Sequence, residues 1–265
     1  MITGRESLIA LSVVNGGDYQ RITESVKRRK CPTDEVIISI CKSIKSKVTT
    51  ILDPDYPSIL RLSCPRPPYV LFYYGDISLA GDYERVLAIV GSRAANEYAY
   101  KKCEELSTAM AEKGYIICSG LARGIDTAAA IGSSKFPGKS IAIMGCGIDR
   151  PYPLENTSLR DLIAGNGLVI SEYPGDTPPN PGNFPLRNRL IASLSKAVFV
   201  PEVHPRSGTM ITISLALSLS RDIATIPFYA GEGDYLNNEL IKNGAALIDG
   251  VEDLELVMSL PKTRK

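Results

Sequence analysis

Short apolar runs recur between residues 85 and 250, and segments with helical periodicity separate them. The strand-like runs are Val86–Val90, Tyr115–Cys118, Ser140–Met144, Leu168–Ile170, Ala197–Val200, Ile223–Ile226 and Ala246–Ile248. Helical patterns fall at about 95–113, 124–133, 156–164, 184–194, 209–220, 236–242 and 251–259. This alternation is typical of βαβ units. It predicts an α/β fold: a doubly wound, mostly parallel sheet with helices on both faces.

The first 84 residues follow a different pattern. Residues 1–50 carry short amphipathic helical patterns separated by turn residues, and they predict a small helical N-terminal domain. Thr33 or Asp34 is expected to cap its third helix. Residues 51–84 are rich in proline, which favours extended connections, and Tyr69–Tyr74 is expected to form an edge strand. The remaining part, residues 85–260, is expected to be one sheet domain.

Composition narrows the class of function. The chain is 44% hydrophobic and 22% charged with a net charge of +1, so any positive surface must be local. Six cysteines without a CxxC pair and a single histidine, His204, argue against a zinc site, and we expect neither metal nor cofactor. No signal-peptide pattern and no apolar run of about 20 residues is present, so we expect a cytoplasmic protein without a membrane partner.

Small, polar or basic residues follow most of the apolar runs. These loops are Gly91-Ser92-Arg93, Ser119-Gly120-Leu121-Ala122-Arg123-Gly124, Gly145-Cys146-Gly147-Ile148-Asp149, Glu172-Tyr173-Pro174 and Arg206-Ser207-Gly208-Thr209. Because parallel strands bring their carboxyl ends to one edge, the loops are expected to build one ligand site. Glycine turns, helix N-termini and arginines suit an anion. No acid/base pair or metal set is evident, so the pattern favours holding a nucleic-acid backbone over catalysis.

The segment around Phe184 departs from this order, because its basic residues precede a strand. Leu186, Leu190, Ile191 and Leu194 form one apolar stripe of a helix. Arg187 falls inside that stripe, where an unpaired charge is costly. Arg187 and Arg189 also oppose the helix dipole, a conflict that a bound anion would relieve, and Phe184 could stack on a base. In the alternative interpretation, Phe184 staples the helix start and Arg187 pairs with Glu172 or Glu202.

Several single residues have a structural and a functional interpretation. Asp126 and Asn156 are expected as helix N-caps. Tyr152 either packs at the rim of the site or touches a ligand. His204 has no histidine or nucleophile partner in the pattern and is expected at the surface. The basic run Lys27–Lys30 is either a solvated helix end or a nucleic-acid contact.

Taken together, the loops resemble the DNA-processing protein A (DprA/Smf) family. The matching words are Gly91-Ser92-Arg93, Ser119-Gly120-x-Ala122-Arg123-Gly124-Ile125-Asp126, Gly145-x-Gly147-x-Asp149 with Tyr152-Pro153 and Asn156, Ser171-Glu172-Tyr173-Pro174, Asn183-Phe184-Pro185-x-Arg187-Asn188-Arg189-x-Ile191, Ser207-Gly208, and Asn238-x-Leu240-Ile241-x-x-Gly244-Ala245. They cover about residues 50–250 in family order, and the series as a whole is highly specific.

The resemblance implies an extended Rossmann-like fold with a small, sterile-α-motif-like N-terminal domain. It also implies binding of single-stranded DNA, protection of incoming DNA in natural transformation and homologous recombination, loading of the RecA recombinase, and a homodimer. It implies no enzymatic activity. The expected DNA-binding residues are Gly91, Ser92, Arg93, Ser119, Gly120, Arg123, Phe184, Arg187, Asn188, Arg189, Ser207, Gly208 and Thr209.

The chain departs from the family pattern in three places. Pro227-Phe228 stands where Pro-Gly is usual and begins an atypical loop that runs to Tyr235, and Pro201 replaces a small aliphatic residue. We also expect no C-terminal winged-helix domain. Rival interpretations are a nucleotide-binding sensor, a scaffold for protein partners, and a phosphoribohydrolase-like enzyme. Such enzymes carry an acidic residue after a Pro-Gly-Gly-x-Gly-Thr loop, whereas Arg206–Thr212 contains none.

Overall fold

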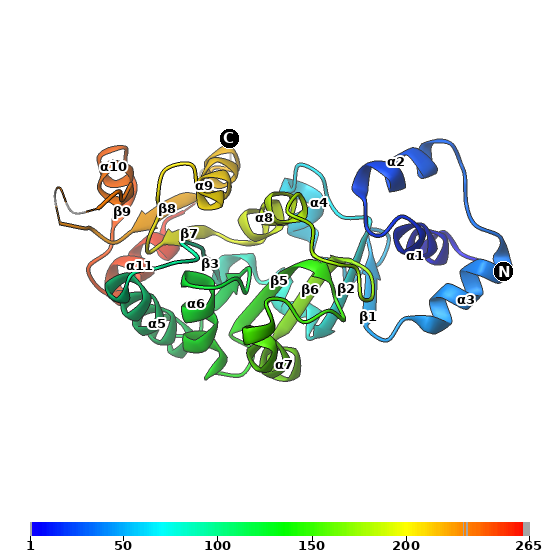
Figure 1. Ribbon diagram of the computed structural model, residues 1–265, viewed down its shortest axis with the longest axis horizontal. Coiled ribbons are helices and arrows are strands. Elements are labelled where there is room, and N and C mark those ends of the chain that lie inside the picture. Colours follow the sequence, from blue (N-terminus) through cyan, green and yellow to red (C-terminus); the bar gives the residue numbers. More distant parts are fainter. Residues whose placement is uncertain (1, 230, 232, 262–265) are drawn as a thin grey trace.

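The computed structural model describes residues 2–229, 231 and 233–261. Residues 230 and 232 of the unusual loop after Pro227, and 262–265 at the chain end, lie outside that range. The described strands form one sheet in the order β1-β2-β6-β5-β4-β3-β7-β8-β9 (Figure 1). The strands are β1 (Lys47–Thr50), β2 (Val70–Gly75), β3 (Val86–Ile89), β4 (Ile116–Ser119), β5 (Ser140–Gly147), β6 (Leu168–Tyr173), β7 (Ala197–Val200), β8 (Asp222–Thr225) and β9 (Ala246–Leu247).

Helices cover both faces of this sheet. They are α1 (Gly4–Val14), α2 (Tyr19–Lys27), α3 (Asp34–Ser43), α4 (Ser58–Ser63), α5 (Glu97–Glu112), α6 (Ile125–Ser134), α7 (Thr157–Asn166), α8 (Asn183–Leu194), α9 (Gly208–Ser218), α10 (Asn237–Lys242) and α11 (Val251–Ser259). Helices α4, α8 and α9 lie on one side, and α5, α6, α7 and α11 lie on the other (Figure 1). The predicted doubly wound α/β, Rossmann-like class is confirmed.

Continuous apolar runs explain the central strands, since a strand covered on both faces needs no polar alternation. All residues of β3, β4 and β7 are buried. The helices between them begin and end within a few residues of the predicted positions. Helix α5, for example, begins after Asn96, whose side chain accepts a hydrogen bond from the Ala99 amide at 2.8 Å.

The strand order places a topological switch between β3 and β7. From β3 the chain proceeds through β4 and β5 to β6 in one direction, and α8 then carries it back to β7 on the other side of β3. The loops after β3 and β7 therefore diverge at their carboxyl ends. Open α/β sheets bind ligands in such a crevice.

The predicted edge strand at Tyr69–Tyr74 lies inside the sheet and not at its edge. Val70–Gly75 is not an edge strand, because β2 pairs antiparallel with β1 on one side and with β6 on the other. The outer position belongs to β1, within the segment predicted to be helical. The proline-rich segment also contains α4 as well as extended chain. Thr33 precedes α3 but makes no side-chain cap hydrogen bond.

Candidate nucleic-acid interface

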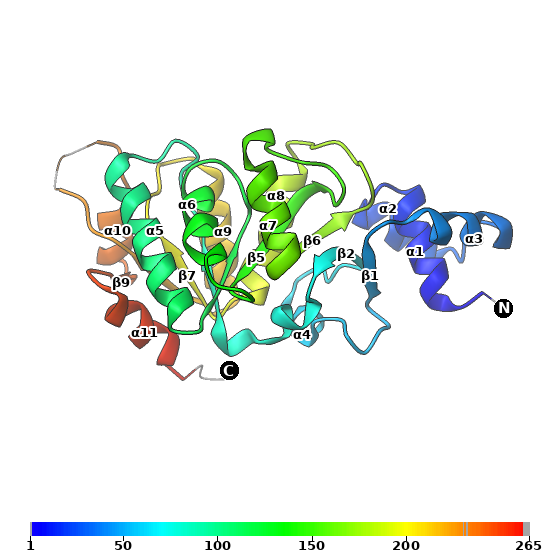
Figure 2. The ribbon, with the colours of Figure 1, turned by 90° about the horizontal axis from the view of Figure 1, so that it is seen from below.

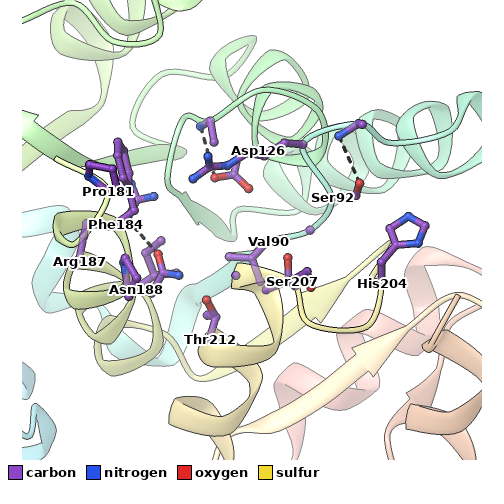
Figure 3. Close-up of a pocket in the computed structure, with 18 residues that line it drawn as sticks. Val90, Ser92, Asp126, Pro181, Phe184, Arg187, Asn188, His204, Ser207 and Thr212 are labelled. Carbon is purple, nitrogen blue, oxygen red and sulfur yellow. Dashed lines mark hydrogen bonds between the residues drawn. The ribbon is translucent and has the colours of Figure 1, made fainter. Parts of the chain in front are cut away.

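A cavity of about 490 Å³ lies at the switch point. It is enclosed by the loop after β3, the start of α6, the first turns of α8 and the start of α9. Figure 3 shows Phe184, Arg187 and Asn188 of α8 on one side, with Ser207 and Thr212 nearer α9. The predicted residues that line it are Gly91, Ser92, Arg93, Phe184, Arg187, Asn188, Ser207, Gly208 and Thr209.

The start of α9 offers free hydrogen-bond donors to this cavity. Helix α9 begins at Gly208, and the side chain of Ser207 makes no capping hydrogen bond. The Ser207 hydroxyl is buried and has no hydrogen-bond partner within the part of the chain that the structure describes. The first amides of a helix have no partner inside the helix and carry a partial positive charge. These donors fit an anionic oxygen.

Glycines let the loops approach one another closely. A Cβ atom at Gly91 would lie 2.6 Å from Cγ1 of Ile125. Gly124 has a φ of +71°, and a Cβ there would lie 2.2 Å from the carbonyl oxygen of Ser92. The same Ser92 oxygen accepts a hydrogen bond from the Ile125 amide at 3.1 Å. The loop after β3 and the start of α6 are thus held together by backbone contacts that a larger residue would break.

Arg93, which is exposed, and Phe184, which is partly buried, form the part of the wall that a ligand can reach. The Arg93 guanidinium lies 5.3 Å from the centroid of the Phe184 ring. Arg93 is exposed and forms no ion pair with any residue that the structure describes. Tyr152 lies on another side of Phe184, with ring centroids 5.6 Å apart. A phosphate beside Arg93 and a base near these rings would both find suitable partners.

Arg187, in contrast, is buried and holds the loops in place. It donates hydrogen bonds to the carbonyl oxygens of Gly120, at 2.8 Å, and Ile143, and its Nε donates to Asn188 at 3.1 Å. Burial lowers its pKa, and the nearby Asp126 carboxylate opposes that shift. Neither Glu172 nor Glu202 pairs with it, so the predicted ion pair between Arg187 and either residue is wrong.

Asp126 has a different role from the predicted helix cap. The structure begins α6 after Gly124, and the buried Asp126 carboxylate accepts hydrogen bonds from the amides of Gly120, at 3.1 Å, and Ala122, at 3.3 Å. Burial raises the pKa of this carboxyl group, while Arg187 and the two amides lower it. Asp126 thus fixes the loop after β4 beneath the cavity.

A second hollow of about 660 Å³ adjoins the first and shares Arg93, Ala94, Ala122 and Phe184 with it. Gly120, Arg123 and Tyr152 line this hollow. Arg123 is exposed and pairs with Glu155. Ser119 is buried at the end of β4 and lines neither space.

Arg189 lies away from the other predicted residues. It is buried in a bidentate ion pair with Glu172, with 2.6 Å between Nη1 and Oε1, and it lines a cavity on the opposite side of α8. Positions 187 and 189 are two residues apart, which is about 200° around a helix, so they face opposite directions. That spacing could have separated them from the sequence alone.

Sequence reasoning missed some lining residues. His204 keeps the expected surface position, with 36% of its side chain accessible, but it also lines the cavity. Its ring nitrogens lie 2.9 Å from Oε1 of Glu202 and 2.9 Å from the carbonyl oxygen of Asp234. Thr212, one turn into α9, also lines it. Asn156 precedes α7 but makes no side-chain cap and instead donates to Leu121 at 3.0 Å. No cluster of metal-ligating side chains occurs within the described ranges.

Comparison with known proteins decides the family. The family described as DNA recombination-mediator protein A matches residues 47–258. This chain belongs to that family. The match begins at β1 and includes every loop that lines the cavity, and it confirms the resemblance drawn from the sequence.

Curated relatives and solved structures agree with this placement. The chain is 39% identical over 207 residues to the DNA processing protein DprA of Streptococcus pneumoniae, covering 77% of this chain and 72% of the relative. It is 36% identical over 221 residues to Protein Smf of Synechocystis, covering 83% of this chain but only 55% of the relative. The S. pneumoniae DprA structure superposes with a TM-score of 0.77 and 32% identity, covering 95% of this chain and 92% of that one.

A second solved structure, DNA processing protein A from Helicobacter pylori, has a TM-score of 0.70 and 30% identity. The alignment covers 80% of this chain and 94% of that one. Among the described helices, none combines the length and the apolar character needed to cross a bilayer.

Proposed function

We propose that this protein binds single-stranded DNA at the cavity between β3 and β7, without strong preference for sequence. The observation that carries the proposal is the uncapped start of α9 beside the exposed Arg93 and the partly buried Phe184. Backbone phosphates would accept hydrogen bonds from the α9 amides, from the orphan Ser207 hydroxyl and from Arg93. A base would stack on Phe184. The faces of bases are accessible for such stacking in a single strand but not in a duplex.

Several other predicted residues act in the proposal as support. Arg187 and Gly120 hold the cavity's shape, Asn188 and Thr209 add polar groups to the wall, and Arg123 extends the positive surface into the adjoining hollow. The H. pylori relative has been studied for its mode of binding single-stranded DNA, which supports the same ligand class here.

The family supports a wider role. We include in the proposal a function in DNA recombination, with protection of incoming single strands during natural transformation and delivery of these strands to RecA. A homodimer would join two cavities and raise the avidity for a long strand through effective concentration. The proposed role is binding, not catalysis, and places the protein where DNA is processed, in the cytoplasm.

Competition for a fluorescent strand tests the ligand class. A labelled strand of about 35 nucleotides, longer than the ~4–16 nucleotides of common single-strand sites, is bound first. Unlabelled single strand, duplex and AMP are then added. The proposal expects displacement by single strand at far lower concentration than by duplex or AMP. Displacement by micromolar AMP would instead favour the nucleotide sensor or hydrolase interpretation.

A further inference from the structure

A third cavity, of about 480 Å³, lies on the other side of α8. One wall is the turn between α1 and α2, and the floor is the carboxyl end of β6. Figure 2 shows β6 directed towards the α1 and α2 region. The cavity is as large as the one at the switch point, and the proposed function leaves it without a role.

The first turns of α8 separate the two cavities. Phe184 and Arg187 line the switch-point cavity, whereas Asn183 and Leu186 line the third cavity. Pro179 lines both the third cavity and the hollow that contains Arg123. A helix with its side chains is about 10–12 Å across. A DNA strand that leaves Phe184 therefore has to pass over only the width of α8, about 10–12 Å, before it enters the third cavity.

The charges around the third cavity favour a polyanion. Arg189 and Glu172 neutralise each other in its floor. Arg66 is exposed on the wall, and its guanidinium has no ion pair within the described residues. Arg21 is largely exposed at the mouth, 3.8 Å from Asp18, whose carboxylate also accepts hydrogen bonds from the first amides of α2. The two exposed arginines outweigh the single acidic group beside them.

The third cavity has a closely packed floor and an aromatic wall. Gly17 has a φ of +77°, and a Cβ there would lie 2.6 Å from the carbonyl oxygen of Glu172, so the turn is seated directly on the end of β6. Tyr19 lines the cavity and stacks on Tyr69, with ring centroids 5.2 Å apart. Aromatic rings beside arginines are what single-strand sites use to hold bases and backbone together.

We propose that the cavity between the α1–α2 turn and β6 is a second subsite for single-stranded DNA, occupied by the part of the strand that has crossed α8. This inference rests on the proposed function of the switch-point cavity. Arg66 and Arg21 would hold phosphates and Tyr19 would contact a base, so the N-terminal helices would lengthen the DNA footprint.

Strand length separates the two subsites in an experiment. Fluorescence anisotropy is measured on the full chain with labelled oligo-dT of about 6 and about 20 nucleotides, sizes that bracket common single-strand sites. Arg66→Glu and Arg21→Glu are compared with Arg85→Glu. Arg85 is a matched control because it is also exposed, with 63% of its side chain accessible, and it lies just before the amino end of the central strand β3, whereas the cavities lie at the carboxyl ends of the strands.

The proposal expects Arg66→Glu and Arg21→Glu each to weaken the long strand roughly tenfold, the loss expected for one charge-assisted hydrogen bond. The short strand should change less than about twofold in these variants. Its binding should depend on Arg93, and its unchanged affinity shows that each variant is folded. Equal losses for both lengths, or no greater loss than in Arg85→Glu, would overturn the second subsite alone. If the wild-type protein bound neither the short nor the long strand, the proposed function would be overturned as well.

Discussion

The contact between Gly120 and Arg187 yields a quantitative prediction for Gly120→Ala. A Cβ atom at position 120 would lie 2.3 Å from Nη2 and 2.6 Å from Cζ of Arg187. The guanidinium is buried and cannot move without giving up its hydrogen bonds to Gly120 and Ile143. Each such bond from a charged donor contributes about 1.5–3 kcal/mol. We therefore expect the free energy of unfolding to fall by about 3 kcal/mol, the lower end of the sum.

Urea denaturation followed by circular dichroism measures this loss. Gly182→Ala is the matched control, because Gly182 precedes α8 with a helical φ of −68° and its nearest neighbour would lie 3.5 Å from a Cβ. It should change stability by no more than about 0.5 kcal/mol. A double-mutant cycle isolates the contact. In an Arg187→Ala background, Gly120→Ala should cost almost nothing, and an equal cost in both backgrounds would refute the role assigned to Arg187.

Two further predictions concern buried groups. Arg189→Met leaves the buried Glu172 without its partner and should lower the free energy of unfolding by about 3–5 kcal/mol, whereas Arg189→Met with Glu172→Gln should recover most of this loss; urea titrations of both variants check it, and no recovery in the double variant would contradict the pairing. Burial raises the pKa of Cys118 to about 12, so at pH 8 only about one thiol in 10⁴ is ionised. A thiol-exchange dye should therefore modify exposed Cys31 long before Cys118, and equal rates would show that the sheet opens readily.

The sequence predicted the sheet well because a doubly covered strand must be apolar along its whole length. The seven runs between Val86 and Ile248 fall on β3–β9, and the glycine loops after them meet at one edge as expected. The pairing of β2 could not be predicted in this way. Its neighbour β1 is short, and its four residues change from exposed to buried along the strand, so no periodic signal announces an antiparallel addition to the sheet.

The candidate site was predicted in position but not in the role of each side chain. A ligand can reach Arg93 and Phe184, as a ligand site requires. Arg187 instead donates hydrogen bonds to carbonyl oxygens, and Arg189 forms an ion pair with Glu172. Those partners come from loops far away in the sequence, and only the fold brings them together. Asp126 shows the same limit: its place near a helix start suggested a cap, yet its acceptors serve the preceding loop.

The salt dependence of single-strand binding tests the central claim most directly. Affinity for a labelled strand is measured by anisotropy at several salt concentrations for wild type, Arg93→Ala and Phe184→Ala. On single strands the logarithm of affinity falls by about 0.7 per decade of salt for each phosphate neutralised. We predict that Arg93→Ala weakens binding and makes the slope about 0.7 shallower, and that Phe184→Ala loses about 1–3 kcal/mol of affinity with the slope unchanged. Wild-type affinity in both variants, with an unchanged slope, would contradict DNA binding at this cavity.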